Sequence, residues 1–207
     1  TVKAAPEAGA LIEAAKLGGD VGYVVADARS GKILEAVNPR DALPPASTAK
    51  TITSLYALER LGTGHRFATR VLVTGPVAGG VVEGDLILAG SGDPEMDTDK
   101  LGDLAARLAA TGIRQVRGAF LIHDGALPAI ARIADDQPDH VGYNPAICGL
   151  NLNYNRVHFE WKRGQDGYGV VMDARGERFS PQVRLARMEV VRRDAPLFTY
   201  RERSGAE

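Results

Sequence analysis

A serine and a lysine three residues apart are the pair in this sequence best suited to do chemistry. In the stretch ALPPASTAKTITSLYALERLG (residues 42–62), Ser47 and Lys50 stand at the predicted start of a helix. Residues i and i+3 share a helix face with Cβ atoms roughly 5–6 Å apart, so the lysine amine can reach the serine hydroxyl. A neutral amine there can accept the hydroxyl proton and leave an activated oxygen nucleophile. The pattern is compatible with covalent catalysis, in which Ser47 would be the nucleophile and Lys50 its base.

Two other interpretations of Ser47 are open at this point. Serine is a favoured N-cap residue, because its hydroxyl accepts a hydrogen bond from a free backbone N–H of the first turn. Since Ser and Lys are common, one chance Ser-x-x-Lys is expected in roughly every 200–300 residues, and spacing alone favours the cap. A Ser–His–Asp triad with His123 and Asp124 is the other alternative, but nothing in the sequence brings those residues to Ser47.

The element that must position the pair is an amphipathic helix. Ile52, Leu55 and Tyr56 follow the i, i+3, i+4 spacing of an apolar helix face. Gly62 is a typical residue beyond a helix end. Upstream, two β-prone runs within residues 21–37 flank a turn that contains a glycine, which predicts a hairpin.

After about Phe67 the sequence is dominated by predicted strands. Residues 67–75 and 80–90 predict two strands that turn at Gly79-Gly80. A helix with one apolar face follows, and then a strand over residues 115–125. This strand–helix–strand order predicts a small α/β unit. A long loop then leads to three runs that alternate apolar and polar residues, as half-buried antiparallel strands do: residues 155–163, 168–178 and 183–193.

Composition and spacing argue against several classes of function. With 25 Lys+Arg and 26 Asp+Glu, the net charge of −1 gives no bulk electrostatic reason to bind nucleic acid or an anionic membrane. No apolar run approaches the roughly 20 residues that span a bilayer, so we expect no transmembrane segment. The four histidines lack metal-ligand spacing, and the carboxylates of residues 93–99 lack the pattern of a calcium loop. We expect no metal and no other cofactor.

The sequence around Ser47 resembles that of a known protein family. The stretch LPPASTAKTITSLYALERLG looks like the nucleophile helix of the D-alanyl-D-alanine carboxypeptidase/endopeptidase group, the low-molecular-mass class C penicillin-binding proteins. GVVEGDLILAGSGDPEM, DLAARLAATGIRQVRGAFLIHDGAL and YNPAICGLNLNYN look like successive pieces of its inserted region. The resemblance implies an α+β fold. Residues 1–66 would form the N-terminal part of a serine DD-peptidase (β-lactamase-like) catalytic domain, and residues 67–207 an inserted strand-rich α/β domain.

The chain also departs from the pattern of that family. Such enzymes combine Ser-x-x-Lys with a Ser-x-Asn and a Lys-Thr-Gly strand, and neither of the last two occurs in the 207 residues. We therefore expect this chain to be the N-terminal part of a longer enzyme, with an incomplete inserted domain. The apolar face of the Ser47 helix would then have to pack against other residues of this chain or against a second chain, so self-association is one possibility.

The resemblance implies a function. Ser47 would attack the terminal D-Ala-D-Ala bond of peptidoglycan stem peptides, with Lys50 as base, and would be acylated by β-lactam antibiotics as covalent inhibitors. Such a substrate implies a periplasmic protein whose leader has been removed. The alternatives are a non-catalytic fragment that binds cell-wall material or a protein partner, and a β-lactamase. The β-lactamase is disfavoured, because a strand-rich insertion after the first helix is not expected there.

Overall fold

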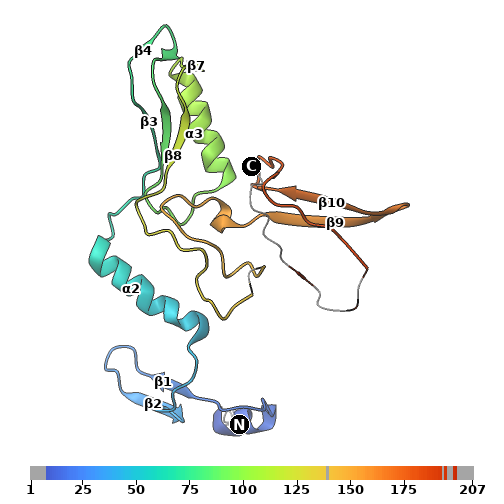
Figure 1. Ribbon diagram of the computed structural model, residues 1–207. Helices are drawn as coiled ribbons and strands as arrows, with labels where there is room; N and C mark the ends of the chain where they lie inside the picture. Colours follow the sequence, from blue (N-terminus) through green and yellow to red (C-terminus); the bar gives the residue numbers. More distant parts are fainter. Residues whose placement is uncertain (1–7, 139, 193, 195–197, 200–207) are drawn as a thin grey trace, which may run out of the picture. The chain divides into compact units, whose positions relative to one another are not determined.

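The computed structural model describes residues 8–138, 140–192, 194, 198 and 199. The chain divides into two compact units, Thr1–His65 and Arg66–Glu207, which are called unit 1 and unit 2. Helices and strands occur in both units (Figure 1), so the expected α+β class is confirmed.

Unit 1 begins with the short helix α1 (Ala8–Ala15) and the predicted hairpin, which is confirmed as β1 (Tyr23–Ala26) paired antiparallel with β2 (Ile33–Val37). The Asp27 carboxylate closes the turn by accepting hydrogen bonds from the Ser30 hydroxyl at 2.6 Å and the Ser30 backbone N–H at 2.7 Å. These bonds lower the pKa of Asp27. Gly31 takes a positive φ of 68°, which glycine adopts without steric cost.

The predicted Ser47 helix is also confirmed. A short 3₁₀ turn, η1 (Ala46–Thr48), leads directly into α2 (Ala49–Leu61). Gly62 ends the helix with φ 80°, and its N–H donates to the Leu58 carbonyl at 2.9 Å. α2 has no buried residue, and Ile52 in its apolar stripe is 73% exposed.

Unit 2 is built on a three-stranded sheet in the order β3-β6-β8. β3 (Arg70–Val73) runs antiparallel to β6 (Leu86–Ala89), and β8 (Phe120–His123) runs parallel to β6. The helix α3 (Thr98–Ala110) connects β6 to β8 (Figure 1). A parallel pair needs such a crossover connection, so the predicted strand–helix–strand unit is confirmed.

A second, smaller sheet joins β4 (Val77–Ala78), β5 (Val81–Val82) and β7 (Gln115–Val116). The prediction of one continuous strand over residues 115–125 is wrong, because β7 and β8 belong to different sheets. At the break, the Gly118 N–H donates to the Gly84 carbonyl at 3.0 Å, and the Ala119 N–H donates to the Asp85 carboxylate at 2.8 Å. A Cβ at Gly118 would collide with Gly84 and Asp85, so only glycine fits there.

The buried apolar residues of the described chain all lie in unit 2, in the segment that runs from β5 through β6 to the approach of α3. They are Val82, Leu86, Leu88 and Met96. Burial of such side chains is the main source of stability for a small domain. Unit 2 therefore holds the core around which its longer loops are arranged.

The C-terminal part of unit 2 begins with the predicted long loop, which pairs with itself only through an isolated bridge between Ile130 and Ile147 among the described residues. β9 (His158–Gly164) and β10 (Gly167–Asp173) then form an antiparallel hairpin, as expected for the first two alternating runs. The expected strand over residues 183–193 is wrong for its described residues 183–192. Only Val183 bonds to β10, through Met172, and the chain then leaves the hairpin. Arg193 lies outside the described residues.

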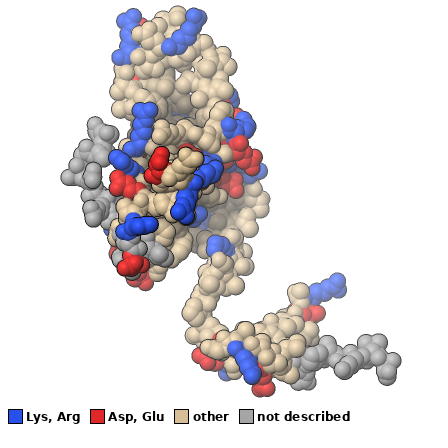
Figure 2. Space-filling model, turned by 90° about the vertical axis from the view of Figure 1, so that its right-hand side faces the viewer, with Lys and Arg blue, Asp and Glu red and all other residues tan. Residues whose placement is uncertain are grey.

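Charged side chains in this hairpin pair with one another. Arg175 donates to Asp173 at 2.8 Å and to Glu160 at 3.1 Å, and Lys162 lies 2.8 Å from Glu160. On the face shown in Figure 2, basic and acidic side chains lie next to one another and do not form a continuous basic surface. This distribution agrees with the net charge of −1.

One carboxylate ties the segment after β10 to the start of α3. Asp99 accepts hydrogen bonds from the backbone N–H groups of Glu177, Arg178 and Phe179 at 2.9 to 3.1 Å. Burial raises the pKa of Asp99, but these donors and the Arg178 guanidinium outweigh it and hold that pKa below its ordinary value. The ionised carboxylate therefore joins segments about 80 residues apart in the sequence.

Asp99→Asn should lower the melting temperature of the protein by on the order of a few degrees, because an amide NH₂ would face backbone donors. A carboxyl whose pKa is lowered by folding contributes stability above its unfolded pKa of about 3.8, and that contribution is lost as the pH falls through the folded pKa. Thermal unfolding measured from pH 7 to pH 3 should show a smaller acid dependence in the variant. Asp166→Asn, in the exposed β9–β10 turn, is the matched control. Equal pH profiles for Asp99→Asn and the original protein would contradict the assignment.

Candidate active site

Ser47 lies inside the 3₁₀ turn that precedes α2. The N-cap positions of the turn and of α2 are Pro45 and Thr48, and neither makes a side-chain capping bond. The structure therefore does not use Ser47 as a helix cap. Its side chain is exposed, which leaves the hydroxyl accessible to a substrate.

The hydroxyl of Ser47 meets the amine of Lys50. Nζ of Lys50 lies 2.8 Å from Oγ of Ser47, in a side-chain hydrogen bond across one helical turn. A nucleophile and its base are expected within about 2.6–3.2 Å of one another, so the pair has the required separation. The α2 N-terminus beside it carries a partial positive charge, which favours a developing oxyanion.

The backbone before Ser47 is strained. Ala46 has φ 45°, in the left-handed region that an L-residue other than glycine, asparagine or aspartate rarely adopts. Such a conformation costs on the order of 1–3 kcal/mol and persists only where its surroundings enforce it. Here the Thr48 N–H and hydroxyl both donate to the Pro45 carbonyl, and the Ala49 N–H donates to Ala46 and Ser47. The turn thereby holds Ser47 in one place.

The sequence indicated the two reactive side chains, Ser47 and Lys50, but not the strained backbone conformation of Ala46. Pro44 and Pro45 predict a stiff approach to the helix, because proline fixes φ. They do not predict which residue takes the left-handed conformation. The bond from the Thr48 side chain to Pro45 was likewise not predicted, although Ser and Thr hydroxyls commonly bond to a carbonyl in this way at turns.

The other candidate groups lie in unit 2. His123 ends β8 and His158 begins β9, so both are strand residues. Within the described ranges, no group of three or more His, Cys, Asp or Glu side chains is arranged to hold a metal ion. Over the same residues, no helix is both long and apolar enough to cross a membrane.

The fold is that of a known class of protein. The crystal structure of penicillin binding protein 4 (dacB) from Haemophilus influenzae aligns with 70% of this chain and 33% of its own, at a TM-score of 0.56 and 24% identity. A structure of the same protein complexed with a novel β-lactam aligns with 76% of this chain and 33% of its own, at a TM-score of 0.56 and 22% identity. These alignments define a fold shared with part of penicillin binding protein 4.

The sequence defines the family more sharply. Residues 8–188 match the D-Ala-D-Ala carboxypeptidase 3 (S13) family, and the chain belongs to that family of peptidases. It is 39% identical over 148 residues to the D-alanyl-D-alanine carboxypeptidase of Actinomadura sp. (strain R39), and 29% identical over 105 residues to D-alanyl-D-alanine carboxypeptidase DacB of Haemophilus influenzae. The matches cover 69% and 51% of this chain but only 27% and 22% of these relatives. The family expected from the Ser47 region is confirmed.

Proposed function

We propose that this chain carries the nucleophile of a serine-type D-Ala-D-Ala carboxypeptidase that acts on peptidoglycan stem peptides. The observation that carries the proposal is the 2.8 Å hydrogen bond between Lys50 Nζ and Ser47 Oγ at the start of α2. Membership of the S13 family supports the choice of substrate. Because peptidoglycan lies outside the cytoplasm, the proposal places the protein in the periplasm.

The reaction follows from the pair. Lys50, in its neutral form, accepts the Ser47 hydroxyl proton while Oγ attacks the carbonyl carbon of the penultimate D-Ala. The C–N bond to the terminal D-Ala then breaks, and its nitrogen takes a proton from the Lys50 ammonium. Water then attacks the carbonyl carbon of the ester, its bond to Ser47 Oγ breaks, and Oγ takes up the proton that the water loses. The partial positive charge at the start of α2 is suited to stabilise the negative oxygen of each tetrahedral intermediate.

A β-lactam fits the first half of this cycle. Its strained ring amide would be opened by Ser47 Oγ to give an ester, and the ring nitrogen would take the proton. The likeness to a fold that has been solved with a β-lactam supports this extension. The preference for a carboxypeptidase or an endopeptidase reaction would depend on groups around the pair that hold the substrate.

Those groups would include the two further elements expected of the family. Ser-x-Asn and Lys-Thr-Gly do not occur in the 207 residues, and the chain matches 27% of the Actinomadura enzyme. We propose that the two elements are supplied by polypeptide beyond these residues. Residues 1–66 would then be part of the catalytic domain, and residues 67–207 part of a domain inserted in it.

Ser47→Ala should abolish covalent labelling by a fluorescent penicillin in the protein as its gene encodes it. The reason is that Oγ of Ser47 is the atom acylated. Labelling is read from a denaturing gel, and far-UV circular dichroism checks the fold. Ser54→Ala, in the same helix, is the control and should keep the label. Labelling that persists in Ser47→Ala would refute the nucleophile assignment.

Lys50→Ala and Lys50→Arg should each lower the acylation rate by about 10²–10⁴-fold, the range of a positioned general base. Arginine keeps the positive charge but stays protonated, so it cannot accept the proton. The double variant with Ser47→Ala should be no worse than Ser47→Ala alone, because nucleophile and base act as a unit. Stopped-flow acylation rates decide this, and a loss below about tenfold in Lys50→Arg would show that Lys50 is not the base.

A further inference from the structure

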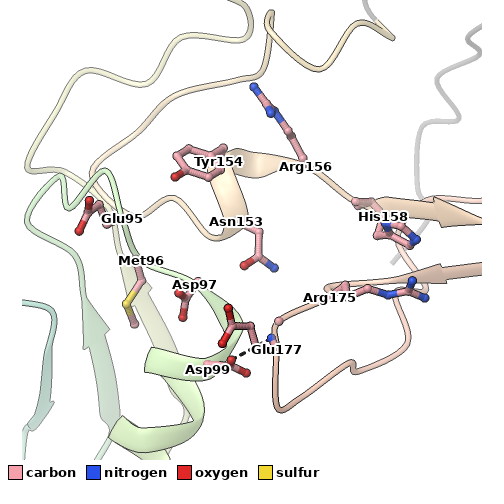
Figure 3. A pocket seen from close by; sticks show the side chains of 12 residues that line it. Glu95, Met96, Asp97, Asp99, Asn153, Tyr154, Arg156, His158, Arg175 and Glu177 are labelled. Carbon is pink, nitrogen blue, oxygen red and sulfur yellow. Dashed lines mark hydrogen bonds between the residues drawn. The ribbon is translucent and has the colours of Figure 1, made fainter.

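Unit 2 contains an open groove of about 730 Å³ where three segments meet. They are the approach and first turn of α3, the short turn η2 (Asn153–Asn155) with the start of β9, and the segment after β10. Figure 3 shows the side chains that line it. Only residues of unit 2 contribute.

The charges in this groove are separated by sign. Glu95, Asp97 and Glu177 lie on the side of the α3 N-terminus and Arg175 on the side of the β9–β10 hairpin, whereas the Arg156 side chain projects from the segment between η2 and β9 (Figure 3). A ligand that carries one charge of each sign can satisfy both sides at once.

One group on each side is available to a ligand. The Glu177 carboxylate and the Arg156 guanidinium form no ion pair with another described residue. Arg175 is different, because Asp173 and Glu160 already hold its guanidinium at 2.8 and 3.1 Å. Asp97 caps α3 by accepting from the Lys100 N–H at 2.7 Å, and the Glu95 carboxylate lies 3.7 Å from the Lys100 amine. Arg156 and Glu177 are therefore the charges of the groove that lack an ionic partner among the described residues.

An aromatic ring is held at the edge of the groove by an unfavourable backbone. Asn153, Tyr154 and Asn155 have φ values of 50°, 58° and 52°. Asparagine tolerates this left-handed region, but tyrosine does not do so readily. Tyr154 is 61% exposed, so burial of the ring does not explain its position. The Arg156 guanidinium lies 5.5 Å from the centre of the ring.

The turn that carries Tyr154 is anchored firmly to α3. The Asn153 N–H donates to the Met96 carbonyl at 3.0 Å. Its side-chain oxygen accepts from the Thr98 N–H at 3.1 Å, and its NH₂ donates to the Thr98 hydroxyl at 2.8 Å. Thr98 is 5% exposed. A strained residue on such an anchored turn, with an exposed ring beside these charges, is characteristic of a binding site.

We propose that this groove binds a short zwitterionic peptide. The ligand ammonium would lie at Glu177, its carboxylate at Arg156, and its aliphatic part against the Tyr154 ring. The ligand class rests on the proposed function, because a stem peptide of the kind proposed there carries a free side-chain ammonium and a C-terminal carboxylate. Arg156 and Glu177 are exposed to solvent, so millimolar affinity is expected.

The test uses Nα-acetyl-L-lysyl-D-alanyl-D-alanine, which has one ammonium and one carboxylate. It is titrated into the Ser47→Ala protein and followed by NMR, so that no turnover occurs. Two matched probes lack one charge each: the Nα,Nε-diacetyl peptide and the C-terminal amide. Binding of the zwitterion should saturate, and each matched probe should bind about 5- to 10-fold more weakly.

Variants then connect each charge to one side of the groove. Arg156→Gln should weaken binding of the zwitterion about fivefold and leave binding of the amide probe unchanged. Glu177→Gln should also weaken binding of the zwitterion about fivefold, but leave binding of the diacetyl probe unchanged. Tyr154→Asn should weaken all three probes without lowering the melting temperature, since asparagine relieves the strain. Arg163→Gln, on the β9–β10 hairpin outside the groove, is the control.

The proposal is overturned if no saturable binding occurs up to about 20 mM, if the three probes bind equally, or if the groove variants behave like Arg163→Gln. The outcome is separable from the proposed function. Penicillin labelling without groove binding would overturn only the groove, and groove binding without labelling would overturn only the role of Ser47.

Discussion

The hydrogen bond between Lys50 and Ser47 is the interaction on which the functional account depends. It exists because a helical turn places residues i and i+3 on one face, and because the 3₁₀ turn before α2 fixes where the first of them stands. The left-handed conformation of Ala46 sets the backbone direction of that turn. The Thr48 hydroxyl stabilises the turn by donating to the Pro45 carbonyl. A serine that acts as a nucleophile must be both accessible and positioned, and this arrangement provides both.

Unit 2 has long loops and a small core, so hydrogen bonds from polar side chains are needed to hold its loops in place. Polar side chains join segments that are far apart in the sequence. The Asp99 carboxylate accepts from three backbone N–H groups after β10, and the Asn153 side chain bonds to the backbone N–H and the hydroxyl of Thr98. The bonds between Asn153 and Thr98 are partly buried, where an unmet partner would be unfavourable. The α3 N-terminus thereby becomes the point where the loop, the turn of Tyr154 and the segment after β10 converge.

The sequence predicted what periodicity and turn chemistry control. The β1–β2 hairpin, α2 with its end at Gly62, and α3 each have a local pattern that matches the structure. Sequence patterns did not predict features that depend on residues far away in the chain. The break between β7 and β8 at Gly118 depends on Gly84 and Asp85. The alternating run after Gln182 has no strand to pair with among the described residues. For the site, Ser-x-x-Lys predicted the pair, but the strain at Ala46 and the charge-separated groove arise from tertiary contacts.

The central claim is that Oγ of Ser47 forms the acyl-enzyme, and the most direct measurement is peptide mapping of the protein after reaction with benzylpenicillin. Trypsin should release residues 41–50, with Ser47 and Lys50 in one peptide. The account predicts a penicilloyl adduct in this peptide, with fragment ions that place it on Ser47 and exclude the neighbouring Thr48. An adduct on Thr48, on Ser54 or in any other peptide, with residues 41–50 unmodified at Ser47, would contradict it.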